Sequence, residues 1–168
     1  MKTFHLFALL LTLPLLLGGC GENNIKPKLE FREGIGYLKE SNQPYTGIQT
    51  GWYRNGRKKF EIHFKNGKEH GPAIGWYANG QKRYEGTHNN GKGVGMNTAW
   101  HENGQKWVRA DFKNGLPEGR LIIWYESGLV KKVDAYFEEG IPDGEFNYWY
   151  DNDQLLYDAV YDLSLIHI

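Results

Sequence analysis

The stretch GIQTGWYRNGRKKFEIHFKNGKEH, residues 47–70, decides the fold because the chain repeats it with small changes. The next two units are GPAIGWYANGQKRYEGTHNNGKGV (71–94) and GMNTAWHENGQKWVRADFKNGLPE (95–118). The fourth, GRLIIWYESGLVKKVDAYFEEGIPD (119–143), has one extra residue, and the fifth, GEFNYWYDNDQLLYDAVYD (144–162), is incomplete. One tryptophan holds the same place in every unit, at intervals of 24, 24, 24 and 25 residues: Trp52, Trp76, Trp100, Trp124 and Trp149. A fixed period of this length indicates a repeat architecture.

Each unit contains two turn signals. The first occurs at Asn55-Gly56, Asn79-Gly80, Asn103-Gly104, Ser127-Gly128 and Asn152-Asp153. The second occurs at Asn66-Gly67, Asn90-Gly91, Asn114-Gly115 and Glu139-Gly140. Glycine accepts the positive φ that a tight hairpin requires, and asparagine tolerates it. The residues between turns are rich in Trp, Tyr, Phe, Ile and Val, which favour strands. The predicted fold class is therefore all-β: a repetitive antiparallel β-meander of stacked hairpins, about 24 residues each, in a single twisted or curled sheet.

Two hairpin registers are compatible with the turn at Asn55-Gly56. A two-residue loop places Phe60 opposite Gly51, whereas a three-residue loop with Gly56 in a bulge places Phe60 opposite Thr50. We predict the second register, because it gathers the apolar residues on one face of the sheet. That face would carry Ile48, Trp52, Phe60, Ile62, Phe64, Ile74, Trp76, Tyr84, Met96, Trp100, Val108, Phe112, Ile122 and Trp124. The extra residue of the fourth unit reverses the parity, so the later members would be Val133, Ala135, Phe137, Trp149, Tyr157 and Tyr161.

The repeated order of Gly, Trp-Tyr, Asn-Gly-Gln-Lys and Phe-x-Asn-Gly-Lys resembles the MORN-repeat variant of YwqK-type antitoxin proteins and of many bacterial lipoproteins. The resemblance covers residues 31–162, and Pro44-Tyr45-Thr46-Gly47 matches the usual start of the first repeat. The fourth and fifth units depart from the pattern at Ser127-Gly128-Leu129 and Asn152-Asp153. The resemblance implies the hairpin fold. It is compatible with a protein-binding or scaffolding lipoprotein and, as the alternative, with an immunity protein or antitoxin that covers a toxin's active site.

The N-terminus indicates export and lipid attachment. Lys2 precedes the apolar run Phe4–Leu17, which is shorter than the roughly 20 residues that span a bilayer. The run ends in Leu17-Gly18-Gly19-Cys20, which resembles the bacterial lipobox, and Cys20 is the only cysteine. The resemblance implies lipidation of Cys20 and a stable membrane anchor. Because Gly21 rather than Asp follows, it also implies the outer membrane of the bacterial cell envelope.

The sequence divides into five expected segments. Residues 1–19 are the lipoprotein signal peptide, and residues 20–30 are the lipidated cysteine and a polar tether. Residues 31–46 form a lead-in strand or cap, and residues 47–162 hold five hairpin repeats. The last six residues, Leu-Ser-Leu-Ile-His-Ile, break the repeat, and they are also the translation of a transposon-end sequencing adapter. We expect residues 163–168 to be adapter read-through and the natural chain to continue.

Composition excludes several classes of function. The 168 residues include 20 basic and 20 acidic side chains, and a net charge of zero argues against phosphate neutralisation by a nucleic-acid binder. A single cysteine excludes a disulfide framework and a Cys-rich zinc site. The chain lacks Gly-x-Ser-x-Gly, His-Glu-x-x-His and a Walker-type loop. We therefore expect no enzymatic activity and no cofactor.

Two groups of residues are candidate sites. The predicted register pairs His70 with His88 across a hairpin, which suits either a metal or a plain cross-strand pair. The lack of a third ligand nearby favours the plain pair. The five repeated tryptophans are either the apolar core or a partner-binding aromatic face, because Trp and Tyr are enriched at interface hot spots. The expected partner is a protein, which in the alternative function is a toxin.

Overall fold

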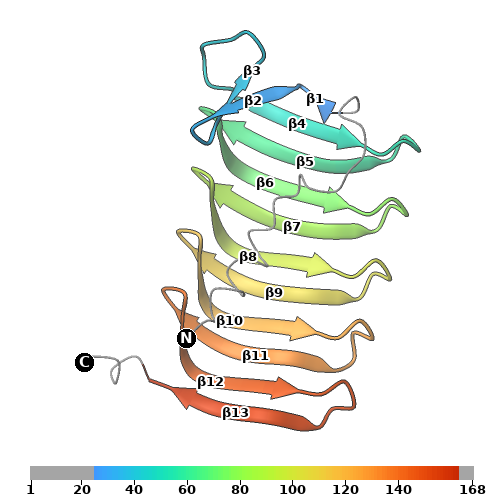
Figure 1. Cartoon of the computed structure of the whole chain (residues 1–168), viewed down its shortest axis with the longest axis vertical. Helices are drawn as coiled ribbons and strands as arrows, with labels where there is room; N and C mark the ends of the chain where they lie inside the picture. The colour runs from blue at the N-terminus through green and yellow to red at the C-terminus, as the bar shows by residue number, and fades with distance from the viewer. Residues whose placement is uncertain (1–24, 163–168) are drawn as a thin grey trace.

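The computed structural model describes residues 25–162, which form β-strands joined by tight turns (Figure 1). The signal peptide, Cys20 and the adapter-like residues 163–168 lie outside the described residues. The strands are β1 (Ile25–Lys26), β2 (Leu29–Arg32), β3 (Ile35–Leu38), β4 (Gly47–Trp52), β5 (Lys58–Lys65), β6 (Lys68–Trp76), β7 (Lys82–Asn89), β8 (Lys92–Trp100), β9 (Lys106–Lys113), β10 (Leu116–Trp124), β11 (Lys131–Glu138), β12 (Ile141–Trp149) and β13 (Leu155–Tyr161).

One long antiparallel sheet contains most of these strands. Its eleven strands follow the order β1-β4-β5-β6-β7-β8-β9-β10-β11-β12-β13, so that from β4 onward each strand pairs with its sequence neighbours. Figure 1 shows the strands stacked along the long axis, with one row of turns at each end of the strands. Strands β2 and β3 form a separate two-stranded sheet at the β4 end. The predicted all-β meander of stacked hairpins is confirmed.

The start of the described chain packs against the first hairpin. β1 pairs with β4, with Ile25 opposite Gly51. Ile25, Leu29 and Tyr45 pack against the buried cluster of the first hairpin, which removes their apolar surface from water. Within the segment predicted as a tether, residues 20–30, Ile25–Lys26 form β1, and Leu29 and Glu30 begin β2.

The loops after Trp52, Trp76 and Trp100 have three residues, as predicted. In the first, the Tyr53 amide donates to the Arg57 carbonyl at 2.8 Å, and the Gly56 amide donates to the Tyr53 carbonyl at 3.0 Å. Gly56 has a φ of +82°, which glycine adopts without strain. The same pair of bonds recurs in the next two loops.

A bulge immediately after each loop changes the register that we predicted. Trp52 lies opposite Lys58, but Gly51 lies opposite Phe60, so Lys59 is an extra residue on the second strand. The predicted pairing of Thr50 with Phe60 is therefore wrong. The same irregularity separates Gly75 from Trp76, Ala99 from Trp100 and Tyr148 from Trp149. A bulge of this kind moves all the residues beyond it by one position in the pairing.

The shifted register places the repeated tryptophans on the face of the sheet that does not carry the core. We name the face with the buried clusters the core face and the other the outer face. The core-face prediction is right for the second strand of each hairpin, including Phe60, Ile62 and Phe64. The prediction is wrong for the first strand of each hairpin. There the core residues of the second strand lie opposite the neighbours of the predicted residues, and because side chains alternate along a strand, the predicted residues point outward. The wrongly placed residues are Ile48, Trp52, Ile74, Trp76, Met96, Trp100, Ile122, Trp124 and Trp149. After the extra residue, Val133, Ala135 and Phe137 face the core as predicted.

The core of this sheet depends on large side chains lying over small ones. Phe60, from β5, is 1% exposed and lies between Gly51 on β4 and Gly75 on β6. A Cβ added at Gly51 would lie 2.9 Å from Cδ1 of Phe60, so the ring occupies the space that a larger residue would need. The sheet thus buries aromatic rings by laying them across its own glycine and alanine positions.

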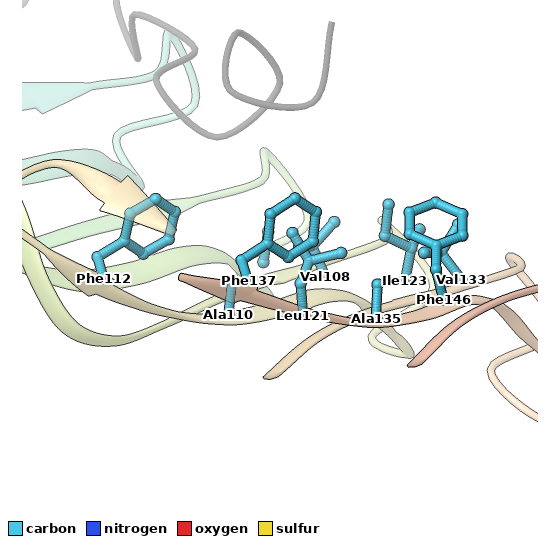
Figure 2. Close-up of a cluster of buried hydrophobic side chains, with 10 residues drawn as sticks. Val108, Ala110, Phe112, Leu121, Ile123, Val133, Ala135, Phe137 and Phe146 are labelled. Carbon is cyan, nitrogen blue, oxygen red and sulfur yellow. The ribbon is translucent and has the colours of Figure 1, made fainter. Parts of the chain in front are cut away.

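A second, larger cluster lies in the later hairpins. Figure 2 shows its side chains standing on the same side of the sheet, with the rings of Phe112, Phe137 and Phe146 in a row. β6, β8, β10 and β12 each contain an irregularity or a positive-φ glycine near their first residues, at Gly71, Gly95, Gly119 and Gly144. These strands bend there (Figure 1), so the sheet curls.

Asp134 on the outer face is buried beneath two basic side chains. Nε of Arg120 donates to one carboxylate oxygen at 2.7 Å, and Nζ of Lys131 donates to the other at 2.7 Å. Burial disfavours the charged carboxylate, but the hydrogen bonds from Arg120 and Lys131 outweigh it and hold the pKa of Asp134 below its usual value.

We expect Asp134→Asn to make the stability of the protein less dependent on pH in acid. The folded-state pKa lies below the unfolded value of about 3.9, so the ionised carboxylate stabilises the fold above that pH. This contribution is lost as the pH falls toward the folded-state pKa. Melting temperatures measured between about pH 7 and pH 2 should fall more steeply for the wild type than for Asp134→Asn. The melting temperature of Arg120→Gln should also fall less steeply with decreasing pH than that of the wild type. Parallel profiles for all three proteins would contradict the assignment.

Candidate binding surface

Five tryptophans form a column on the outer face of the sheet. Each is the last residue of the first strand of its hairpin, at the ends of β4, β6, β8, β10 and β12. Because the hairpins stack in sequence order, the five positions follow one another along the long axis of Figure 1. All five side chains are half-buried, and none belongs to either buried cluster. We call Trp52, Trp76, Trp100, Trp124 and Trp149 the tryptophan column.

Tyrosine hydroxyls hold the backbone of the column in place. The Tyr53 hydroxyl donates to the Trp76 carbonyl at 2.7 Å, and Tyr77 donates in the same way to Trp100 at 2.7 Å. Tyr125 repeats the contact with Trp149 at 2.9 Å. These three hairpins therefore fix the tryptophan position of the next one, since the bonds satisfy carbonyls at the ends of the strands. In the third hairpin His101 takes the place of the tyrosine, with its Nε2 3.4 Å from the Trp124 carbonyl oxygen. Sequence reasoning missed this role, although the Trp-Tyr pair signals it.

The asparagines of the first turn type form a parallel ladder. The side-chain amides of Asn55, Asn79 and Asn103 donate to carbonyls in the next turn at 3.1, 2.9 and 2.7 Å. Their side-chain oxygens accept the amide two residues later, which fixes the turn itself. In the second turn type, by contrast, the asparagines adopt positive φ, as at Asn66 with +51°. We predicted the positive φ but not the ladder.

Lysines from the preceding hairpin lie over two of the tryptophans. Nζ of Lys58 is 5.4 Å from the ring centroid of Trp76, and Nζ of Lys82 is 5.5 Å from that of Trp100. Both distances are within the range of a cation–π contact. The Lys58 ammonium also hydrogen-bonds Glu61 and lowers the pKa of that carboxyl group. The rings thus combine apolar surface with a nearby positive charge.

A shallow pocket of about 360 Å³ adjoins the middle of the column. Its lining comprises Gln81, Lys82, Trp100 and Gly104, from two successive hairpins. A Cβ at Gly104 would lie 2.7 Å from Oε1 of Gln81, so the glycine allows the Gln81 side chain to lie across the next turn. The pocket combines an aromatic ring, an ammonium and an amide, which suits polar as well as apolar groups of a partner.

Charge is segregated along the sheet although the chain is neutral. Residues 47–113 contain twelve Lys or Arg and five Asp or Glu, a net charge of +7. Residues 131–162 contain two basic and nine acidic residues, a net charge of −7. Because the strands stack in order, the first three hairpins form a basic part and the C-terminal strands an acidic part (Figure 1).

The two candidate histidines do not form the predicted pair. The bulge after Trp76 places His88 opposite Gly71 instead of His70, so the predicted pairing is wrong for the reason given above. Nε2 of His88 lies 3.5 Å from a carboxylate oxygen of Glu69. In the described part of the chain, no group of three or more His, Cys, Asp or Glu residues is placed to hold a metal ion.

A polar interruption separates the two apolar clusters on the core face. Tyr84, Gly86 and His88 occupy the positions that hold large apolar side chains in the first hairpin. Buried Asn97 lies beside Gly86, and its Oδ1 accepts the Thr87 amide at 3.2 Å. Burial, with the nearby charge of Glu69 adding to it, raises the pKa of Tyr84. The interruption explains why the core is two clusters and not one.

These features define an open β-hairpin repeat protein with a structured outer face. Residues 45–66 and 69–90 each match the family described as the MORN repeat variant. The first two hairpins are therefore similar to MORN repeats of the variant type, and the later hairpins continue the same strand pairing outside the matched residues. No curated protein matches the chain in sequence. Residues 25–162 include no helix with the length and apolarity that crossing a membrane requires.

Proposed function

We propose that this protein is a non-enzymatic lipoprotein of the bacterial cell envelope, anchored through Cys20, whose tryptophan column binds a protein partner. The observation that carries the proposal is the position of the column. Five large aromatic side chains recur on the outer face, half-exposed, while phenylalanines and aliphatic residues form the core on the other face.

The arrangement supports binding in three ways. Trp and Tyr are the residue types most enriched in interface hot spots. The tyrosine and asparagine ladders fix the column before a partner arrives, which reduces the entropy lost on binding. Stacked repeats also present the same group at regular intervals, which suits an extended partner surface.

The N-terminal features of the sequence support the location. The apolar run and the lipobox-like Leu17-Gly18-Gly19-Cys20 favour export and lipid attachment, and Gly21 favours the outer membrane. A lipid anchor would confine the repeats to the membrane surface, where a repeat scaffold and its partner meet at high effective concentration.

We expect the double variant Trp76→Ser and Trp100→Ser to weaken partner binding at least tenfold while the protein stays folded. Loss of one hot-spot side chain typically costs 2 kcal/mol or more, and about 1.4 kcal/mol is a factor of ten. The partner would be cross-linked to the full chain in envelope membranes and identified by mass spectrometry. Its affinity for purified wild-type and variant chains would then be measured by calorimetry.

Tyr136→Ser is the matched control, because Tyr136 is an exposed outer-face aromatic on β11 away from the column. It should bind like the wild type. Equal losses for the control and the double variant would contradict a role of the column. So would a collapse of the melting temperature in the double variant, since it would place the two tryptophans in the core.

A further inference from the structure

The tryptophan column has a regular spacing along the sheet. Successive members lie two strands apart, at the ends of β4, β6, β8, β10 and β12. Because neighbouring strands are roughly 4.7–4.9 Å apart, successive tryptophans are about 9.5 Å apart. The tyrosine and asparagine ladders join the hairpins and hold this spacing. A ligand that lies along the column therefore meets one indole ring per hairpin.

Two carboxylates beside the column are already neutralised. Oε2 of Glu61 lies 2.7 Å from Nζ of Lys58, and Oε2 of Glu85 lies 2.8 Å from Nζ of Lys82. These ion pairs contribute no net charge, so the excess positive charge of the first three hairpins comes from other side chains.

Each of the first three hairpins has at least one basic side chain near the column that forms no ion pair within residues 25–162. These side chains are Arg57, Arg83 and Lys106. Nη1 of Arg57 donates to the Asn79 carbonyl in the next turn, and the Arg83 guanidinium lies 5.8 Å from the ring centroid of Tyr77. Lys106 is exposed at the start of β9. Positive charge therefore recurs with the rings, hairpin by hairpin.

The outer face changes sign beyond the third hairpin. Glu145 on β12 and Asp158 on β13 are exposed there, on the same face as Trp149. A flat anionic surface such as a lipid bilayer would meet both signs of charge at once, and like-charge repulsion disfavours that contact. A short acidic segment, by contrast, fits against the first three hairpins alone.

The spacing of the column matches one type of backbone conformation. A polyproline II helix has three residues per turn and rises about 3.1 Å per residue, so one side of it repeats every 9.3 Å or about that. The corresponding repeat is about 6.6 Å for a β-strand and about 5.4 Å for an α-helix. Polyproline II segments also dock onto surfaces lined by aromatic rings, and their preformed conformation loses little entropy.

The pocket at Gln81, Lys82, Trp100 and Gly104 suits one turn of such a helix. The indole ring offers a flat apolar surface for a proline. A polyproline II helix has no internal hydrogen bonds, so its carbonyls need donors from the partner. The side-chain amide of Gln81 and the Lys82 ammonium are donors of this kind.

We propose that the first three hairpins of the tryptophan column bind an acidic, proline-rich segment of the partner protein in the polyproline II conformation. This inference rests on the proposed function and adds the chemistry of the partner. Prolines of the segment pack against the indole rings. One acidic side chain per turn faces the cations that have no carboxylate partner.

Three synthetic peptides test the proposal by fluorescence anisotropy with the full chain. The first has four repeats of Glu-Pro-Pro. Four repeats of Lys-Pro-Pro keep the conformation and reverse the charge, whereas four repeats of Glu-Gly-Ser keep the charge and make the chain flexible. The Glu-Pro-Pro peptide should bind at least tenfold more tightly than either of the other two. Its affinity should fall in high salt, because salt screens exposed charges.

The double variant Arg83→Gln with Lys106→Gln should weaken binding of the Glu-Pro-Pro peptide about tenfold, because it removes two charges that face the ligand. Lys65→Gln with Lys92→Gln is the matched control. It removes the same charge at the other row of turns, where β5 ends and β8 begins, and should bind like the wild type. Melting temperatures check that each variant is folded.

Several results would overturn the proposal. Equal affinities for the Glu-Pro-Pro and Glu-Gly-Ser peptides would show that conformation does not select the ligand, and equal affinities for Glu-Pro-Pro and Lys-Pro-Pro would show that charge does not. Equal losses in the two double variants would exclude a local role of Arg83 and Lys106. Vesicles of anionic phospholipid that bind the wild type and not the Arg83 and Lys106 variant would identify a membrane as the occupant.

The cross-linked envelope partner separates this inference from the proposed function. Loss of its affinity in both the tryptophan variant and the Arg83 and Lys106 variant supports both. Loss only in Trp76→Ser with Trp100→Ser would mean that the column binds a protein of different chemistry, and would exclude the acidic proline-rich segment alone. Unchanged affinity in both variants would contradict the proposed function as well.

Discussion

Replacing Phe60 with alanine is expected to lower the free energy of unfolding by about 3–5 kcal/mol, the range for a buried Phe→Ala change. Phe60 is 1% exposed and lies between Gly51 and Gly75, so nothing beside it can expand into the space that the ring leaves. The cost combines the lost burial of the ring with a cavity on the core face. Urea unfolding followed by circular dichroism measures it.

Trp76→Ala is the matched control for that change. Trp76 is also a large aromatic, but it is half-buried on the outer face, so we expect a cost of only about 1–2 kcal/mol. A larger loss for Trp76→Ala than for Phe60→Ala would contradict the assignment of the two faces, and with it the proposal that the tryptophan column is available to a partner.

The second large effect is expected at Gly67, where the first hairpin meets the small sheet of β2 and β3. The Gly67 amide donates to the Tyr45 carbonyl at 2.7 Å, and its carbonyl accepts the Gly36 amide at 2.8 Å. A Cβ here would lie 2.7 Å from the Gly36 carbonyl oxygen, and φ is +75°. Gly67→Ala should therefore lower the free energy of unfolding by about 2–5 kcal/mol, because the residue is strained and its Cβ forces the segment around Gly67 away from the segment around Gly36.

Gly91 occupies the same turn position one hairpin later and isolates the two contributions. Its φ is +80°, but a Cβ there would meet nothing within 4 Å. Gly91→Ala should cost only about 1–2 kcal/mol, the strain of a left-handed residue. Hydrogen exchange of the Gly36 amide should accelerate in Gly67→Ala and not in Gly91→Ala. Equal losses of stability in the two variants would show that the contact with the small sheet is unimportant.

The fold could be predicted from the sequence because its two main determinants are local. The tryptophan period defines the repeat, and the glycines at positive φ, such as Gly56 and Gly67, define where each strand ends. These signals specify a hairpin without reference to the rest of the chain. They could not show that Ile25–Lys26 and Leu29–Arg32 form strands, because Ile25 and Leu29 pack against the first hairpin and not within a local turn.

The register could not be predicted because the core positions of the first strands do not look apolar. In β4 these positions are Gln49 and Gly51, while Ile48 and Trp52 point outward. A pattern of large apolar residues therefore favours the wrong face. Glycine belongs in the core here because Phe60 lies across it, and this relation between strands is invisible in either strand alone.

The same bulge explains what was missed in the candidate sites. It separates His70 from His88, and it moves the tryptophans out of the core. The tyrosine and asparagine ladders join residues 23 or 24 positions apart, so they become visible only when hairpins are stacked. Tyr53 and Asn55 nevertheless recur at Tyr77 and Asn79, and that recurrence is the signal for the ladders in the sequence.

The register of the first hairpin is the most direct test of the whole account, and cross-strand nuclear Overhauser effects in the labelled protein measure it. The bulge at Lys59 predicts contacts between Gly51 and Phe60 and between Gln49 and Ile62. It follows that Trp52 and Phe60 lie on opposite faces. Contacts between Thr50 and Phe60 instead would place Trp52 and Phe60 on the same face and make the tryptophan column part of the core.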